Sequence, residues 1–340
     1  MASYHLSVKT IKRSAGRSAT AAAAYRSASR IICDREGRLH DYTAKRGVEV
    51  TFILAPADAP SWAQDRAALW NAAEARETRS NSVTAREWEL ALPSEISDAA
   101  RIEIAGAFAQ ALVDRYGVGA DVAIHAPHRE GDQRNHHAHI LTTTRALSAE
   151  GLGAKTRILD ATATGGPEIE VMRALWADLQ NRALERAGEA ERVDHRSLEA
   201  QRAAALAEGD ELAAEALDRA PEVKLGPATN AMERRERRAA DVESREYVPL
   251  TERGAKVHAA RQTRAVFEEL RQRLEQVRDA YEDARDDGQS RVTAGLAALR
   301  AAAGRQASAA RTGDDIRERL AQIVSQDRRH GQVFKAPLGV

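Results

Sequence analysis

The sequence predicts an α+β fold, a five-stranded antiparallel sheet with helices, followed by an α-helical carboxyl-terminal region. Five short segments either alternate apolar and polar residues or are rich in β-branched residues, as strands are. Segments of helical periodicity fall between them, which favours helices layered on one sheet. Alanine is abundant, aromatic residues make up 4% and charged residues 30%, so long solvated helices are expected.

The expected strands are short, and turn or loop residues follow them. They cover residues 4–9, 48–54, 86–92, 121–126 and 137–144. The first and third alternate apolar and polar residues, whereas the second is rich in β-branched residues. Pro56 follows the second strand and Pro93 follows the third, where a missing backbone donor ends sheet pairing.

Helices are expected between these strands. Ser18 can cap a helix that runs through residues 21–32, AAAAYRSASRII. Residues 61–79 and 97–115 have helical periodicity, and Ser97 opens the second of these segments. Residues 154–168 are rich in threonine and glycine and predict a loop, while a helix over 171–187 stops at Gly188.

From about residue 232 the chain is charged, alanine-rich and helical. Apolar residues then recur at alternating steps of three and four, which is typical of a short coiled-coil seam: Phe267, Leu270, Leu274, Val277, Tyr281 and Ala284. Gly288 interrupts this pattern before a second helix. We therefore expect an amino-terminal domain over residues 1–230 and a charged helical or coiled-coil region over residues 231–340.

Cysteine usage and hydropathy exclude several classes of protein. The single cysteine, Cys33, excludes an internal disulfide framework. No apolar run approaches the roughly 18 residues of a membrane span, and the first residues lack the apolar centre of a signal peptide. A cytoplasmic protein without membrane insertion is expected.

The formal net charge is zero, but positive charge is concentrated at the amino terminus. Residues 1–33 contain no aspartate or glutamate and six basic residues, namely Lys9, Lys12, Arg13, Arg17, Arg26 and Arg30. A patch of one sign attracts polyanions such as nucleic acids. Charge alone is equally consistent with an ordinary solvated stretch.

Histidines are concentrated in residues 135–141, NHHAHIL. Alternate residues of a strand share a face, so His137 and His139 lie side by side. A hairpin between strands 121–126 and 137–144 brings His125 beside them. Three neutral imidazoles with open coordination positions suit a catalytic divalent ion. His136 points to the opposite face, and the loop position of His128 leaves its direction open.

One tyrosine lies in an unusual environment. Tyr25 is surrounded by small side chains and flanked by Arg17, Arg26 and Arg30. Core packing is the usual role of a helix tyrosine. Here small neighbours leave the phenol reachable, and the guanidiniums can hold a phosphate. Among the other tyrosines, Tyr42 is the strongest rival as a reactive group.

These segments together resemble the MobA/MobL family of plasmid mobilisation relaxases, and the amino-terminal part of TraA relaxases is similar. The resemblance runs in chain order over about residues 1–228, through YHLSVKTIKRSAGRSATAAAAYRSASR (4–30), AREWELALP (85–93), AIH (123–125), NHHAHIL and VDHRSLEAQ (193–201). These relaxases are histidine-hydrophobe-histidine (HUH) endonucleases. They nick one strand at an origin of transfer, become joined to the 5′ end through a tyrosine, and later rejoin the strand.

The resemblance assigns roles residue by residue. It implies metal ligands at His125, His137 and His139, the nucleophile at Tyr25, and an acidic motif at Glu87 and Glu89. Which glutamate assists the metal ligands or Tyr25 stays open. A divalent cofactor, Mg²⁺ or Mn²⁺, is implied. The implied partners are single-stranded origin-of-transfer DNA, relaxosome accessory proteins and a type IV secretion coupling protein. The six basic residues are expected to track the DNA backbone. Separately, the coiled-coil pattern of the helical tail would allow it to bind a second copy of the chain.

Two other functions are compatible with parts of this pattern. A replication-initiator or transposase nuclease of the same chemistry often places its tyrosine after the histidine pair, whereas Tyr25 precedes it. A helical DNA-binding or scaffold protein with a structural zinc would close its site with four protein ligands. Residues 193–201 fit a DNA-binding wall and an ordinary capped helix start equally well. The glycine-rich phosphate loop of nucleotide-driven motors is absent from the sequence, so no motor is expected.

Overall fold

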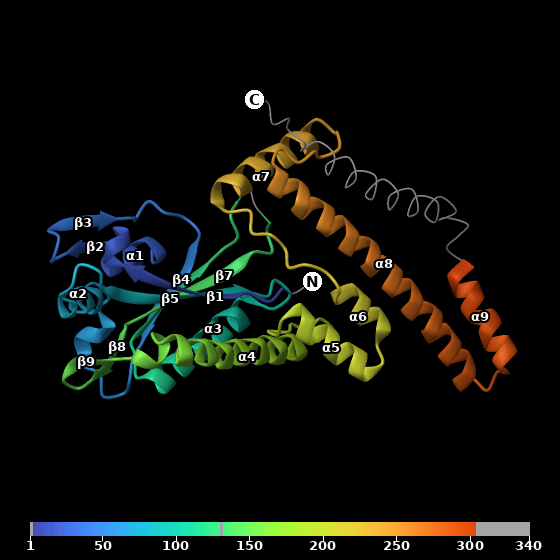
Figure 1. The fold of residues 1–340 in the computed structure, drawn as a ribbon, viewed down its shortest axis with the longest axis horizontal. Coiled ribbons are helices and arrows are strands. Elements are labelled where there is room, and N and C mark those ends of the chain that lie inside the picture. Colours follow the sequence, from blue (N-terminus) through green and yellow to red (C-terminus); the bar gives the residue numbers. More distant parts are fainter. Residues whose placement is uncertain (1–2, 130–131, 304–340) are drawn as a thin grey trace, which may run out of the picture. The chain divides into compact units, whose positions relative to one another are not determined.

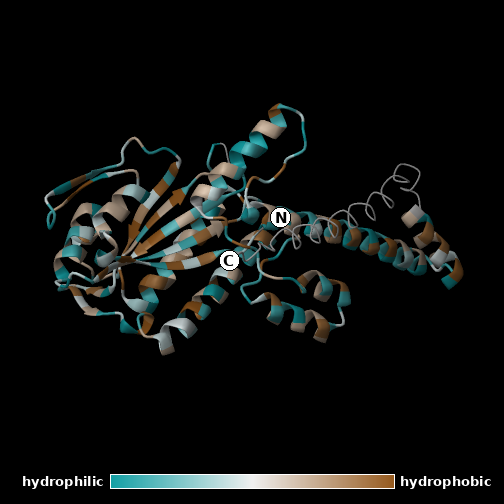
Figure 2. Cartoon of the chain, turned by 45° about the horizontal axis from the view of Figure 1, so that its top comes forward, coloured by the Kyte–Doolittle hydropathy of each residue, from teal (hydrophilic) through white to brown (hydrophobic). Residues whose placement is uncertain are grey.

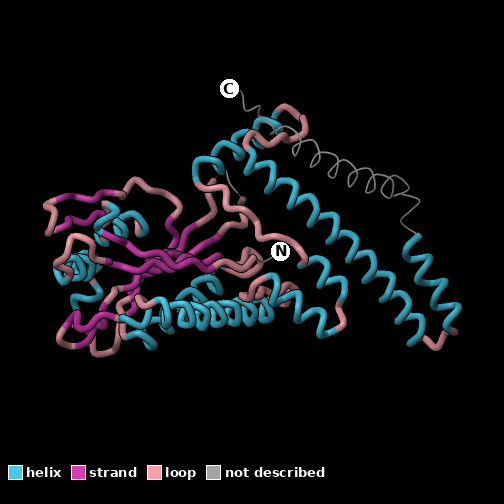
Figure 3. The backbone as a smooth tube through the Cα atoms, in the orientation of Figure 1, coloured by secondary structure: helices cyan, strands magenta, loops and turns pink. Residues whose placement is uncertain are grey.

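The computed structural model describes residues 3–129 and 132–303. Contacts between residues group the chain into two compact units, Met1–Arg196 and Ser197–Val340. Figure 1 labels the helices and strands of both units, and Figure 3 shows that the strands belong to the first.

A five-stranded sheet forms the centre of the first unit. Its strands are β1 (Leu6–Lys12), β4 (Val48–Leu54), β5 (Val83–Leu92), β6 (Ala120–His125) and β7 (His136–Thr142). They lie in the order β1-β5-β7-β6-β4, and every neighbouring pair is antiparallel. The predicted five-stranded antiparallel α+β fold is therefore confirmed. The histidine-containing strand β7 is the middle strand of this sheet.

Side chains alternate between two differently covered faces of the sheet. On one face, Trp88 and Ile140 pack into a core with helices α3 (Asp98–Tyr116) and α4 (Thr162–Arg186). On the other face, Ala85 and Leu141 pack with α1 (Ala19–Arg26) and α2 (Arg66–Arg76). Because residues two apart share a face, His137 and His139 of β7 and Glu87 and Glu89 of β5 lie on the α1 side. Figure 1 shows these two layers, and Figure 2 shows hydrophobic residues recurring along the strands.

The expected helix over residues 21–32 ends earlier, at Arg26, so this prediction is wrong at its carboxyl end. Ala28 adopts a left-handed φ of 51°, and the Ser29 amide donates to the Ala24 carbonyl at 3.0 Å, which closes the helix. The chain then forms β2 (Arg30–Cys33), which pairs with β3 (Arg38–Asp41). Pairing with β3, which lies beyond the residues of the predicted helix, outweighed the local helical preference.

The expected loop over residues 154–168 is mostly regular structure. It contains the end of β9 (Gly151–Lys155), which pairs with β8 (Arg145–Ser148), and the start of α4. At Gly165 a Cβ atom would lie 2.9 Å from the Leu159 carbonyl oxygen, so this glycine allows close packing rather than a loop. The helix expected over 61–79 is a 3-10 turn, Ser61–Gln64, followed by α2, while the helix expected over 97–115 is confirmed as α3.

A buried carboxylate fixes the position of α1. Glu74 of α2 is fully buried and accepts a hydrogen bond of 2.6 Å from the first-turn amide of Ala19. Its other oxygen accepts from Arg13 at 2.7 Å and lies 3.3 Å from Arg35. Glu74 therefore joins the end of β1, the start of α1 and the β2–β3 hairpin.

Glu74→Ala is expected to lower the free energy of unfolding by about 3–5 kcal/mol, because the nearly buried Arg13 guanidinium loses its counter-charge. Urea unfolding followed by circular dichroism measures the loss. Glu103→Ala, at an exposed ion pair on α3, is the matched control and should change stability by less than about 1 kcal/mol. Equal stability of the two variants would contradict this role.

The described part of the second unit is helical. Its helices are α5 (Leu198–Glu208), α6 (Glu211–Leu217), α7 (Pro227–Val242), α8 (Glu252–Asp286) and α9 (Arg291–Ala303). On α8 the predicted seam is largely exposed at Phe267, Leu270 and Leu274, and Figure 2 shows α8 as mostly hydrophilic. The rest of the predicted helical region, residues 304–340, lies outside the described residues. Among the described helices, none is both long and apolar enough for a membrane span.

Candidate metal and nucleophile site

Three imidazoles converge on the α1 side of the sheet. His125 is the last residue of β6 and lies directly opposite His137 of β7, while His139 lies opposite Ala123. The ring centroids are 5.2 Å (His125–His137), 4.9 Å (His125–His139) and 5.3 Å (His137–His139) apart. Their candidate ligand nitrogens all lie within 4.8 Å of one another. The structure thus brings together the three histidines that the sequence singled out.

Each of these rings has one nitrogen hydrogen-bonded to an oxygen. The pairs are His139 Nδ1 with Glu87 Oε1 at 2.7 Å, His137 Nδ1 with the Asn135 carbonyl at 2.9 Å, and His125 Nε2 with the Arg26 carbonyl at 2.7 Å. A carbonyl or carboxylate oxygen accepts, so the ring nitrogen donates. In a neutral imidazole the opposite nitrogen then carries the lone pair that a metal needs.

Burial sets the charge of this cluster. It lowers the pKa of His125 to about 3 and also lowers the pKa of His137. Burial alone would raise the pKa of Glu87, but hydrogen bonds from His139 and Arg26 outweigh it and lower that pKa to about 2. At neutral pH an ionised Glu87 therefore faces His139, while His125 and His137 are uncharged.

The donor set fits a divalent transition-metal ion. Neutral imidazole nitrogens suit transition-metal ions such as Zn²⁺ and Fe²⁺, whereas Mg²⁺ prefers oxygen ligands. Within the described residues this cluster contains three protein ligands, so further coordination positions are left for water or a substrate oxygen. That arrangement is typical of a catalytic rather than a structural site.

The end of α1 is tied directly to the cluster. Tyr25 lies in the last turn of α1, and its side chain is 50% exposed. The next residue, Arg26, accepts from His125 through its carbonyl and donates to Glu87 Oε1 through Nε at 2.5 Å. The residue after the tyrosine therefore contacts His125 through its backbone and Glu87 through its side chain, although Tyr25 is 100 residues before His125 in the sequence.

Two residues of the β3–β4 connection pack against Tyr25. The Tyr42 ring meets the Tyr25 ring edge-on, with centroids 5.2 Å apart. Lys45 Nζ lies 4.0 Å from the Tyr25 ring centroid and donates to the Tyr25 carbonyl at 2.9 Å. Burial, with a smaller effect of the nearby Arg26 charge, lowers the pKa of Lys45 to about 8. Sequence reasoning missed Lys45, because no periodicity or motif marks this loop position.

The two candidate glutamates have different partners. Glu87 contacts His139 and Arg26, whereas Glu89 forms an ion pair with Lys9 and accepts from Ser7 Oγ at 3.4 Å. Burial alone would raise the pKa of Glu89, but the Lys9 hydrogen bond and charge lower it. Lys9 is thus already paired within the sheet.

The other basic residues of the predicted patch also divide into two groups. Arg13 is held by Glu74 and Arg26 by Glu87, whereas Lys12, Arg17 and Arg30 are exposed. Of the two weaker histidine candidates, His128 is exposed and His136 lies near Arg101 of α3, on the sheet face away from the cluster.

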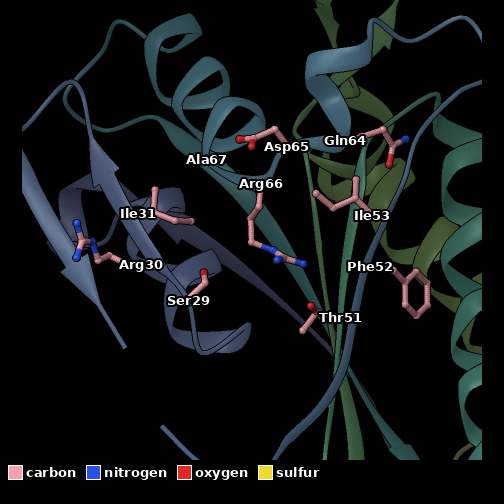
Figure 4. A pocket seen from close by; sticks show the side chains of 10 residues that line it. All are labelled: Ser29, Arg30, Ile31, Thr51, Phe52, Ile53, Gln64, Asp65, Arg66 and Ala67. Atoms are coloured by element: carbon pink, nitrogen blue, oxygen red, sulfur yellow. The ribbon is translucent and has the colours of Figure 1, made fainter. Parts of the chain in front are cut away.

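A separate pocket of about 390 Å³ lies between β2, β4 and the start of α2, lined by residues 29–31, 51–53 and 64–67. Figure 4 shows Arg30 and Arg66 among its side chains. Arg66 is held by two-pronged hydrogen bonds of 2.8–3.0 Å to the buried Asp121. The lining residues are distinct from the histidine cluster.

Glu87→Gln is expected to destabilise the fold by about 2 kcal/mol at pH 7, since it removes a charged hydrogen-bond partner of Arg26 and His139. A carboxyl whose folded pKa is depressed stabilises the fold above its unfolded pKa and loses this effect as pH falls. The stability gap between wild type and variant should therefore narrow from about pH 4.3 toward pH 2. Urea midpoints across this range measure it, and a constant gap would contradict the assignment.

The chain is similar in sequence to known mobilisation and conjugal-transfer proteins. The MobA/MobL family model matches residues 17–235. The chain is 39% identical to "Mobilization protein MobL" of Acidithiobacillus ferridurans over 261 residues, covering 69% of this chain and 65% of that protein. It is 34% identical to "Probable conjugal transfer protein TraA" of Sinorhizobium fredii over 263 residues, covering 69% of this chain and 22% of that protein. The match thus spans less than two thirds of either relative.

A solved structure supports the same grouping. The chain resembles the structure described as "Molecular Basis of Vancomycin Resistance Transfer in Staphylococcus aureus", with a TM-score of 0.51 and 33% identity. The match covers 58% of this chain and all of that one. Sequence, fold and family model agree over the unit that holds the histidine cluster, and the chain therefore belongs to the MobA/MobL family.

Proposed function

We propose that this chain is a relaxase that nicks one strand at a plasmid origin of transfer through Tyr25, and rejoins the strand after transfer. The observation that carries the proposal is the double contact of Arg26, which joins the tyrosine-bearing end of α1 to His125 and to Glu87. The mobilisation and conjugal-transfer names of the relatives support the same biological setting.

The three imidazoles would hold the metal ion through Nδ1 of His125 and Nε2 of His137 and His139. When bound, a divalent ion would supply positive charge to a non-bridging oxygen of the scissile phosphate. Glu87 positions His139 by accepting from its Nδ1, and Asn135 does the same for His137 through its carbonyl. The nitrogen donors favour Mn²⁺ over Mg²⁺ as the supporting ion.

Tyr25 supplies the nucleophilic oxygen. The phenol loses its proton to solvent and its oxygen forms a bond to phosphorus. The bond from phosphorus to the 3′ oxygen breaks, and that oxygen takes a proton from solvent and leaves as a 3′-hydroxyl. One phosphate ester replaces another, so the step can be reversed to rejoin the strand. Lys45, close above the ring, stabilises the phenolate with its positive charge. This contact supports Tyr25 rather than Tyr42 as the nucleophile.

The substrate is single-stranded DNA, since a paired and stacked strand does not expose its phosphate to a tyrosine. The exposed Lys12, Arg17 and Arg30 are suited to tracking its backbone. Arg13 and Arg26 are occupied by buried glutamates, so we assign them to positioning α1 rather than to direct contact with DNA. Lys9 is paired with Glu89 and contributes less than the exposed residues.

The test is a covalent-adduct assay. The full chain is incubated with Mn²⁺ and a 5′-fluorescent or 3′-fluorescent single strand that contains the plasmid's own origin, and the products are then denatured. The proposal expects a protein adduct on the fragment with the 3′ label and a released fragment with a free 3′-hydroxyl. Cleavage without an adduct would indicate hydrolysis, and an adduct on the opposite fragment would indicate the opposite polarity; either contradicts the proposal.

We further propose that residues 1–230 carry the nuclease and residues 231–340 serve partner contacts, such as relaxosome accessory proteins, the secretion coupling protein or a second copy. The partly exposed apolar seam on α8 supports this division. A 1–230 fragment is expected to nick origin DNA within about threefold of the full chain, while plasmid transfer in cells falls by at least about tenfold. A folded fragment without nicking activity would refute the division.

A further inference from the structure

A second group of metal-binding side chains lies on the β2–β3 hairpin. Cys33 belongs to β2, His40 belongs to β3, and Glu36 lies in the turn between them. Their candidate ligand atoms, one thiol sulfur, one carboxylate oxygen and one imidazole nitrogen, all lie within 4.8 Å of one another. Proximity alone does not make a metal site. The burial and the hydrogen-bond partners of each residue must also favour metal binding.

The hairpin geometry explains why these residues meet. In its register Ile31 pairs with His40 and Cys33 pairs with Arg38. Cys33 and His40 are 0% and 7% exposed, whereas Ile32 and Leu39 on the alternate positions are exposed, so both ligands face inward. Gly37 has a φ of 61°, which turns the chain so that the Glu36 carboxylate lies beside the pair.

The buried ring nitrogen of His40 indicates a bound ligand, because this nitrogen lacks a hydrogen-bond partner among the described residues. Among the described residues, no hydrogen-bond partner contacts His40 Nε2, although this atom is buried. The nearest carboxylate oxygen, Glu36 Oε2, lies 4.0 Å away, which is too far for a hydrogen bond. Leaving such an atom unsatisfied destabilises the fold, because burial removes its hydrogen bonds to water. A cation between the nitrogen and the oxygen would satisfy both.

We propose that Cys33, Glu36 and His40 bind one divalent transition-metal ion, with Zn²⁺ as the best match and water as a fourth ligand. Ligands at about 2.0–2.3 Å from a tetrahedral zinc lie roughly 3.5 Å apart, so a small rotation of the exposed Glu36 completes the site. The thiolate and carboxylate balance the ion's two charges. On binding, the Cys33 thiol releases its proton to solvent.

Neighbouring residues support this ligand set. Arg35 pairs with Oε1 of Glu36 and also lies 3.3 Å from Glu74, which leaves Oε2 of Glu36 turned toward His40. Sulfur and imidazole donors disfavour Mg²⁺ and Ca²⁺, which select oxygen ligands. The hairpin site is therefore chemically distinct from the cluster of three imidazoles.

The position of the hairpin suggests what the ion does. His40 is followed closely by Tyr42 and Lys45, which pack against Tyr25. A metal ion that joins β2 to β3 would hold this segment against the tyrosine. Only this positioning role rests on the proposed function; metal binding itself is independent of it.

Cobalt titration of the metal-free, untagged full chain tests the site. Cys33 is the only cysteine in the 340 residues, so a thiolate-to-cobalt charge-transfer band in the near ultraviolet reports this site alone. We expect a band that saturates, is displaced by Zn²⁺, and is absent from Cys33→Ser. The double variant His137→Ala with His139→Ala should keep the band, which separates this site from the proposed nuclease.

Glu36→Gln is a second variant that should leave the fold intact, because Glu36 is exposed. Loss of a direct ligand is expected to weaken cobalt binding by at least about tenfold, since even partners outside the ligand shell contribute 10- to 100-fold. Circular dichroism verifies that each variant is folded. Absence of a thiolate band at saturating cobalt in the folded wild type, or unchanged affinity in Glu36→Gln, overturns the proposal.

Discussion

Tyr25→Phe is expected to abolish strand nicking and the covalent DNA adduct, while folding and single-strand binding persist. The substitution removes one hydroxyl and keeps the ring that packs against Tyr42 and Lys45. Because the tyrosine side chain is half exposed, loss of its hydroxyl leaves no buried polar group unsatisfied. Nicking should fall below about one thousandth of the wild-type rate, as is usual when the nucleophile of a covalent mechanism is removed.

Tyr42→Phe is the matched control for this variant. It removes the same hydroxyl group from the neighbouring ring. Tyr42 is less exposed than Tyr25, and its backbone amide donates to the Ser29 carbonyl at 3.1 Å. Its nicking rate should stay within about threefold of wild type. Mass spectrometry of the protease-digested adduct locates the modified residue. A DNA-linked peptide that carries Tyr42, or nicking by Tyr25→Phe, would show that the nucleophile is assigned wrongly.

Removing the metal ligands should have an effect of similar size. His137→Ala with His139→Ala eliminates two of the three nitrogens of the cluster, and chelation of the wild type should act in the same way. Loss of the metal's charge at the phosphate costs several kcal/mol of transition-state stabilisation, or at least about 10³-fold in rate. DNA binding should persist, because the proposed phosphate contacts of the exposed Lys12, Arg17 and Arg30 do not depend on the two histidines.

Two measurements and one control variant separate these effects. Nicking rates with Mn²⁺ and with Mg²⁺ show which ion the site uses, and Mn²⁺ should act at lower concentration. Fluorescence anisotropy with a labelled single strand measures binding at several salt concentrations. His128→Ala, which changes an exposed loop histidine, should leave both properties unchanged. A double variant that nicks at the wild-type rate would exclude the cluster as the catalytic metal site.

The strands and their inward faces could be predicted because their pattern is local. Alternation along residues 86–92 and 137–144 reports which side chains share a face, and the structure confirms it in β5 and β7. His137 and His139 lie on one face for the same reason. His125 could be added because a hairpin is the simplest connection between adjacent antiparallel strands, and the structure pairs it with His137.

Contacts between distant segments decided what local patterns left open. Glu89 is the direct cross-strand neighbour of His139, yet Glu87 forms the hydrogen bond. Glu87 is also held by Arg26 at the end of α1, whereas Lys9 of β1 pairs with Glu89. Both glutamates share one face, so alternation alone could not distinguish them.

The tertiary structure also decided how the basic residues are used and where the first helix ends. Arg13 and Arg17 lie in the same basic segment of the sequence, but of the two only Arg13 forms an ion pair with the buried Glu74 of α2. Residues 27–32 follow an alanine-rich helix and contain small side chains, so local propensity continued the helix through them. Instead, residues 27–29 form the turn that ends α1, and pairing with β3 makes residues 30–33 a strand. Sequence periodicity reports the face of an element, whereas the choice among partners depends on which distant groups the folded chain brings within hydrogen-bonding distance.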